Sequence, residues 1–204
     1  MRVHYLLVAV GLGLGAGLAP GPLLALVVTT ALSRGLRAAI RVALSPLVTD
    51  SIMILLAVLV VRELPARAAG LLGVVGGCYV VWLGVESLRD TAVVVDSEPD
   101  SSGLLRRGVL VNLLSPHPWL FWLTVGGPII VAAWGESAVS AVVFVVAFFV
   151  SMIGTKAVIA AVVATTRRAL TPTGVHRAYR VAGALLLLTG VLLVAEFAGT
   201  LLHG

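Results

Sequence analysis

The sequence predicts an all-α integral membrane protein with six transmembrane helices, arranged as two inverted three-helix repeats. Hydrophobic residues make up 60% of the 204 residues, and only 11% are charged. A soluble domain carries charge on roughly a quarter of its residues, so most of this protein's outer surface is expected to face lipid. Charge-poor runs of about 20 residues recur along the chain, which is the length that a helix needs to cross a bilayer.

Six apolar segments fit a membrane-spanning helix. Their approximate bounds are 5–30, 42–62, 68–88, 108–132, 138–165 and 181–202. Backbone polar groups in lipid must be satisfied within the segment, which favours helices for runs of this length. The first segment follows Arg2 and has the outline of a signal peptide, but its apolar run continues past the prolines, so we interpret it as a span.

Positive charges are unevenly distributed between the connections. The first, third and fifth connections hold ten arginines: Arg34, Arg37, Arg41, Arg89, Arg106, Arg107, Arg167, Arg168, Arg177 and Arg180. The opposite side holds three: Arg2, Arg62 and Arg67. Because cytoplasmic loops are enriched in Lys and Arg, we expect a multi-pass protein of the cytoplasmic membrane with both termini extracytoplasmic.

The chain divides into two halves around a polar connection. Residues 1–89 form the first expected three-helix repeat and residues 108–204 the second. Residues 90–107 between them lack apolar periodicity over most of their length and are interpreted as a flexible cytoplasmic linker. Each half has an odd number of spans, so the second half is expected to be inverted relative to the first.

A Pro-x-Pro motif occurs in the first span of each half. Pro20, Gly21 and Pro22 correspond to residues 116–118 at an offset of 96, and Pro116 and Pro118 are the prolines of that second motif. Proline lacks an N–H and clashes with the preceding turn, so both spans are expected to break there. Interrupted helices at matching positions of inverted repeats are typical of transporters with a site near the midplane.

Two ionisable residues lie inside the predicted spans. Asp50 and Lys156 are separated by 106 residues, an offset shared by two pairs of glycines in the third and sixth spans. Charges within the bilayer are costly and are expected to face the protein interior. Two roles stay open: a structural ion pair between the two helices, or a site at which they bind substrate or exchange protons.

Further polar residues lie close to these features. Thr49 precedes Asp50, and Asn112 and Ser115 precede the second Pro-x-Pro motif, where they could coordinate a substrate or an ion. His117 is either a titrating gate or an ordinary polar group with a satisfied hydrogen bond. Aromatic residues such as Tyr79 and Trp122 are expected at the lipid interface or in the core.

Several function classes are excluded by composition and motif. The chain lacks a zinc-protease helix, a nucleophile elbow and a phosphate-binding loop, so we expect no enzyme activity. Cys78 is the single cysteine, and no metal site or cofactor is expected. The basic residues are scattered between apolar blocks, which argues against a nucleic-acid partner.

Taken as a set, the motifs resemble those of the LysE/RhtB family of amino-acid exporters. The residues that carry the resemblance are Pro20-Gly21-Pro22, Ser33 to Arg37, Asp50, Gly76 to Gly84, and Asn112 to Pro116. The resemblance implies an inner-membrane carrier that expels amino acids or related small metabolites, is driven by the proton gradient and often forms a homodimer. It places Pro20, Gly21, Pro22, Asp50, Asn112 and Pro116 at the transport site.

The sequence departs from the family pattern at three points. Leu23 stands where asparagine usually follows the first motif, Ser45 and Thr49 replace glycines, and Ser115 replaces the asparagine before Pro116. The expectation is nevertheless a secondary exporter of amino acids or small zwitterionic metabolites, coupled by proton antiport through Asp50. The alternatives are a divalent metal-ion exporter of the same superfamily and a non-transporting membrane scaffold.

Overall fold

The computed structural model describes residues 2–19, 21–89, 103–166 and 172–203. Within these ranges every regular element is a helix, which confirms the all-α prediction. The elements are α1 (Arg2–Leu18), α2 (Pro22–Arg34), α3 (Leu36–Ala43), α4 (Ser45–Val61), α5 (Ala66–Arg89), α6 (Leu104–Leu114), α7 (Pro116–Phe121), the π-helical turn η1 (Trp122–Gly126), α8 (Gly127–Glu136), α9 (Ala138–Thr166) and α10 (Pro172–His203).

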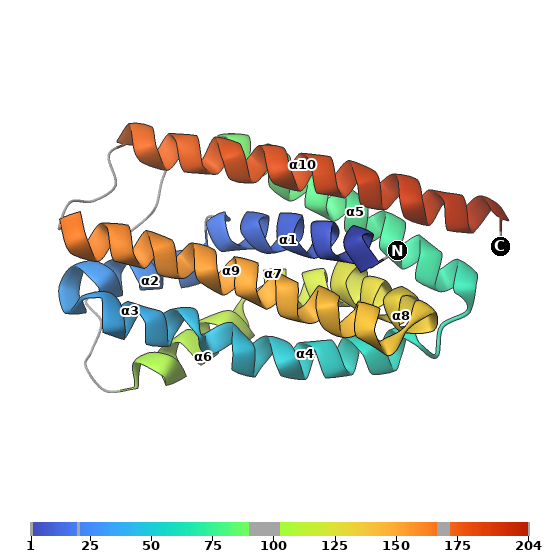
Figure 1. The fold of residues 1–204 in the computed structure, drawn as a ribbon, viewed down its shortest axis with the longest axis horizontal. Coiled ribbons are helices and arrows are strands. Elements are labelled where there is room, and N and C mark those ends of the chain that lie inside the picture. Colours follow the sequence, from blue (N-terminus) through green and yellow to red (C-terminus); the bar gives the residue numbers. More distant parts are fainter. Residues whose placement is uncertain (1, 20, 90–102, 167–171, 204) are drawn as a thin grey trace.

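The helices form an elongated bundle whose two most extensive helix pairs join opposite halves of the sequence. Figure 1 shows α10 (red) running along α5 (green), and α1 (blue) running along α9 (orange). The start of α1 and the end of α10 lie at the same end of the bundle. The chain therefore returns to the end from which it starts.

Several helices are long and apolar enough to cross a membrane. Three stretches meet both criteria without a break: Leu36–Val61, His117–Glu136 and Ala138–Thr165. The pair Val3–Leu18 and Pro22–Arg34, bent by 63°, would be a fourth. Shorter apolar stretches lie in α5 (Gly70–Trp82) and α10 (Leu186–Gly199). The number of spans therefore stays a prediction, while the membrane character of the bundle is clear.

Large apolar side chains also cover the outside of the bundle. Leu55 on α4, Val150 on α9 and Leu188 on α10 are each at least 60% exposed. Large apolar side chains exposed in this way on several helices are unfavourable in water but suit a lipid environment.

The chain changes direction between α1 and α2 and again after α6. The helix α1 ends at Leu18 and α2 begins at Pro22, while Pro20 lies outside the described residues. After α6, Ser115 adopts an extended backbone (φ −77°, ψ 129°) and α7 begins at Pro116. Proline is well suited to the first turn of a helix because the N–H it lacks would have no helical partner there.

Some helix boundaries differ from the sequence predictions. The helical stretch expected from residue 42 already begins at Leu36, because α3 includes the charged Arg37 and Arg41, which an apolar window leaves out. The last helix begins at Pro172 rather than near 181. The helix α6 begins at Leu104, inside the expected linker, and residues 90–102 lie outside the described ranges.

Gly35 joins α2 to α3 through a backbone conformation that favours glycine. Its φ is +80°, in the region where a Cβ atom is strained, and its N–H caps α2 by donating to the Ala31 carbonyl. This tight joint lets α3 fold back alongside α2, as their close packing shows.

Two apolar clusters form the core. The larger one gathers bulky side chains from α1, α4, η1, α8, α9 and α10, including Trp122, Phe144 and Phe148. The smaller one is built mainly from Ala, Val and Leu side chains of α2, α3, α6 and α9, such as Val27 and Val42. The candidate site borders both clusters.

Candidate functional site

A cavity of about 200 Å³ in the bundle is lined by residues that flank both the α1–α2 and the α6–α7 boundaries. One water needs about 10–15 Å³ on this measure, so the cavity has room for a small metabolite. Seven of the residues expected from the sequence line it: Gly21, Pro22, Asp50, Asn112, Ser115, Pro118 and Lys156. Thr49 does not line the cavity but contacts Asp50, and the side chains of Pro20 and Pro116 lie outside the described residues.

Asp50 is held by two polar neighbours on different helices. Its side chain is 4% exposed, and its Oδ1 accepts hydrogen bonds from Thr49 Oγ1 at 3.0 Å and from Asn112 Nδ2 at 2.6 Å. Asn112 also donates to Thr49 Oγ1 at 2.6 Å. Asn112 thus links α6 of the second half to α4 of the first, and it fixes the carboxylate at the cavity wall.

Lys156 is bound to the end of α1. Its side chain is 3% exposed, and Nζ donates to the carbonyl oxygens of Ala16 at 2.9 Å and Gly17 at 3.2 Å. Carbonyls in the last turn of a helix lack helical partners, and the negative end of the helix dipole favours a cation there. An ammonium has three N–H donors, so one remains for a group in the cavity.

Asp50 and Lys156 line the same cavity but make no ion pair with each other in the described structure. Each nevertheless lies within electrostatic reach of the other. Of the two roles left open by the sequence, the direct structural ion pair is therefore not observed. The two opposite charges instead face a common space.

Trp122 is a cavity residue that sequence reasoning missed. Its side chain is 1% exposed, and its indole N–H lies beside the Asp50 carboxyl group, although Nε1 does not reach strict hydrogen-bond geometry with any described residue. A Cβ on Gly126 would collide with the Trp122 ring, so this glycine lets the ring lie back on its own helix. The spacing Trp122 to Gly126 was the available signal, but a buried core tryptophan gives the same pattern.

Tyr79 and His117 form a second polar contact at the cavity. Tyr79 Oη and His117 Nδ1 are 2.7 Å apart, and both residues line the cavity. Their rings stack with Trp82 at centroid distances of 5.8 to 6.5 Å. His117 therefore has a hydrogen-bond partner on α5, as one of the two sequence-based interpretations expected.

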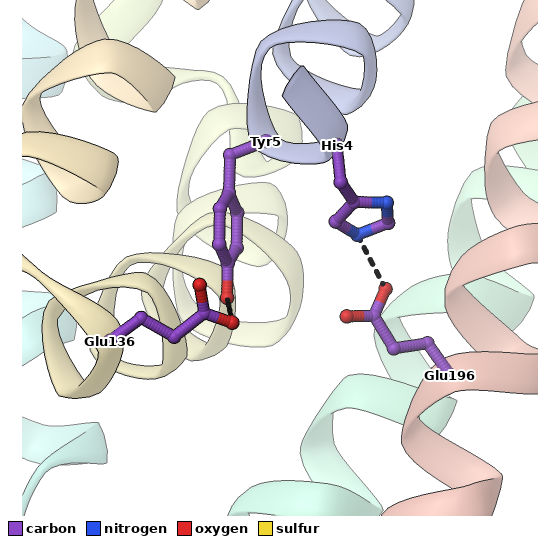
Figure 2. Close-up of polar contacts among 4 residues, drawn as sticks. All are labelled: His4, Tyr5, Glu136 and Glu196. Atoms are coloured by element: carbon purple, nitrogen blue, oxygen red, sulfur yellow. Dashed lines mark hydrogen bonds and ion pairs between the residues drawn. The ribbon is translucent and has the colours of Figure 1, made fainter. Parts of the chain in front are cut away.

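Another polar group lies away from the cavity, where α1 begins. Figure 2 shows Tyr5 Oη donating to Glu136 at 3.1 Å and His4 facing Glu196, with Nε2 3.2 Å from the carboxylate. Tyr5 is buried, whereas His4 and Glu196 are about half exposed. These contacts tie the start of α1 to the end of α8 and to α10.

Metal-binding chemistry has no support in the part of the chain that the structure describes. Within it, no group of three or more His, Cys, Asp or Glu side chains is close enough to hold a metal ion. Asp50 stands beside an amide and a hydroxyl, and a lone carboxylate is a poor ligand set for a divalent cation.

An apolar helical bundle with a cavity lined by a buried acid and a buried base defines a membrane protein with an internal polar site. The family model of the LysE type translocator matches residues 15–196, nearly the whole chain, and the chain belongs to this family.

A curated relative matches over a shorter stretch. The chain is 38% identical over 60 residues to a Vibrio cholerae serotype O1 protein described as an "Uncharacterized membrane protein". That segment is 28% of this chain and spans only 29% of the relative's length. No solved structure matches the chain.

Proposed function

We propose that the protein exports amino acids or similar small zwitterionic metabolites across the cytoplasmic membrane as a secondary active transporter driven by proton antiport. Family membership supplies the translocation activity. The observation that carries the rest is the placement of Asp50 and Lys156 on one cavity without an ion pair between them. A buried acid and a buried base that do not neutralise each other directly suit a ligand that carries both charges.

A zwitterion fits these two charges in one orientation. Its ammonium group lies at Asp50, where Oδ1 is held by Asn112 and Thr49. Its carboxylate lies at Lys156, which has one N–H left after binding two carbonyls. The start of α2 borders the cavity at Pro22, Leu23 and Leu24, and the positive end of its helix dipole adds to the attraction for the carboxylate.

Proton antiport follows from a competition at Asp50. The carboxylate holds either a proton or the substrate ammonium, so the arriving substrate releases the proton on the cytoplasmic side. After the substrate leaves on the other side, Asp50 takes up a proton there and carries it inward. Each cycle then moves one proton in for each zwitterion out, with no covalent bond made in the substrate.

The architecture proposed for this cycle is the pair of inverted repeats, with three spans in residues 1–89 and three in residues 108–204. Two features support it: residues on both sides of the α1–α2 and α6–α7 boundaries border one cavity, and the start of α1 and the end of α10 lie towards the same end of the bundle in Figure 1. The arginine distribution supports extracytoplasmic termini. We also propose a homodimer, which the mass of the protein–detergent complex in solution would test.

Transport into vesicles tests the proposal. Purified protein is reconstituted into liposomes, and accumulation of labelled amino acids is measured with and without an imposed proton gradient. We expect accumulation only with the gradient. Asp50→Asn should lose both accumulation and exchange between equal pools, because the same carboxylate holds the proton and the substrate ammonium. Glu136→Gln is the matched control, because Glu136 does not line the cavity. Full gradient-driven transport by Asp50→Asn would overturn the coupling role, and no transport of any kind by the unmodified protein would favour a scaffold.

A further inference from the structure

The cavity has apolar walls beyond its two charged residues. Phe121, Phe148 and Met152 line it, and Phe148 and Met152 belong to the larger core cluster. The Phe121 and Phe148 rings stack at 5.2 Å, and Trp122 meets Phe148 edge to face at 5.1 Å. This wall is therefore packed ring against ring and is continuous with the core.

The wall lies in register with Lys156 on α9. Phe148, Met152 and Lys156 follow one another at intervals of four residues and all line the cavity, as residues on one face of a helix do. A rise of 1.5 Å per residue places successive members about 6 Å apart along the helix. A carboxylate bound at Lys156 would thus place the substrate's side chain next to Met152 and, further along, Phe148.

No third full charge is available for that side chain. Among the described residues that line the cavity, Asp50 and Lys156 are the acid and the base, and the remaining titratable pair, Tyr79 and His117, is hydrogen-bonded to itself. A charged side chain against Met152 and Phe148 would be buried without a partner, which is strongly unfavourable. An apolar side chain would instead pack against the apolar Met152 and Phe148 side chains.

We infer that the exported substrates are zwitterions with an uncharged, apolar side chain, such as leucine, methionine or phenylalanine, and that Met152 sets the size of that side chain. This inference rests on the proposed function and names its substrate class. Basic and acidic amino acids are excluded by the absence of a compensating charge in the wall.

The test compares a panel of labelled amino acids in the reconstituted protein. Exchange between equal pools is measured for leucine, methionine, phenylalanine, alanine, lysine and glutamate. We expect the first three to exchange at least about tenfold faster than lysine and glutamate, in line with the discrimination that an apolar pocket gives. Exchange of lysine or glutamate at the rate of leucine would overturn the substrate class while leaving the export function intact.

Variants of Met152 test the wall itself. Met152→Ala enlarges the cavity and should shift the preference from leucine towards phenylalanine, whereas Met152→Phe narrows it and should shift the preference towards alanine. Met53→Ala is the matched control, because Met53 is also buried in the larger core cluster but does not line the cavity. An unchanged preference in both Met152 variants, or the same shift in Met53→Ala, would overturn the inference. If no amino acid of the panel exchanges in the unmodified protein, the proposed function fails together with it.

Discussion

Lys156 caps a helix that lies 140 residues earlier in the sequence, donating from Nζ to the Ala16 carbonyl oxygen at 2.9 Å. A second bond reaches Gly17. The charge is therefore part of the support of α1 as well as part of the cavity. This double role leads to the first prediction.

Replacing Lys156 should lower the stability of the protein, whether or not a substrate is bound. Lys156→Met keeps the length of the side chain but leaves two buried carbonyls without a donor, so we expect a loss of about 3 kcal/mol in the free energy of unfolding. Thermal unfolding in detergent micelles measures it. Lys156→Arg keeps the charge and the donors and should lose much less. Equal stability of Lys156→Met and the unmodified protein would contradict the capping role.

Replacing Asn112 should lower stability and transport more than replacing its polar neighbour Ser115. Asn112→Leu removes two hydrogen bonds, one of them to a carboxylate, and we expect a loss of about 2–4 kcal/mol and of gradient-driven transport. Ser115 Oγ donates instead to a nearby backbone group, the Val111 carbonyl of α6 at 2.7 Å. Ser115→Ala should therefore change the unfolding temperature little. Similar effects of the two substitutions would count against the Asn112 link.

Gly76 should not tolerate a methyl group. A Cβ there would collide with the Thr124 carbonyl of η1, so Gly76→Ala must push α5 away from η1. We expect this to lower the free energy of unfolding by about 1–3 kcal/mol. Gly154 lies in the middle of α9 with open space around it. Gly154→Ala should be neutral or slightly stabilising, because alanine favours helix. The two melting temperatures, compared with that of the unmodified protein, decide the prediction.

The two contacts of Figure 2 should differ in strength although they lie side by side. Tyr5→Phe removes a hydrogen bond between a buried ring and Glu136, and we expect a loss of about 1 kcal/mol. His4→Ala breaks a contact between half-exposed groups, where a pair contributes little. Thermal unfolding of both variants at neutral pH tests this order. A larger loss of stability in His4→Ala than in Tyr5→Phe would contradict the prediction.

Cysteine labelling should locate the two sides of the membrane. Cys78→Ser removes the single thiol, after which Glu63→Cys and Ser101→Cys place one on opposite expected sides. A membrane-impermeant maleimide added to intact cells should label the first and not the second. Labelling of Ser101→Cys alone would invert the proposed orientation.

The features that could be predicted from the sequence are those marked by a pattern within one continuous stretch of residues. Apolar runs of span length identified a helical membrane protein, and charges inside those runs pointed to Asp50 and Lys156, which do line one cavity. Helices α2 and α7 begin at Pro22 and Pro116, while the breaks expected at the two Pro-x-Pro motifs stay a prediction. Each of these signals depends only on residues that are close together in the sequence.

Other features depend on where distant segments meet. The bond from Lys156 to Ala16 uses a backbone carbonyl, which every residue has, so no sequence pattern marks it. Trp122 looks like any core tryptophan until the cavity beside it is known. The start of α3 was missed because Arg37 and Arg41 lie on an amphipathic helix that an apolar window excludes.

The pairing of α1 with α9 and of α5 with α10 has a consequence for biosynthesis. During translation α1 and α5 enter the membrane well before their main partners are made, so lipid or an insertase must shield their packing faces in the meantime. Close glycine contacts such as Gly77 with Gly190 can form only when α10 arrives. Completion of the chain, rather than insertion of its first helices, is then the step that commits the protein to its folded state.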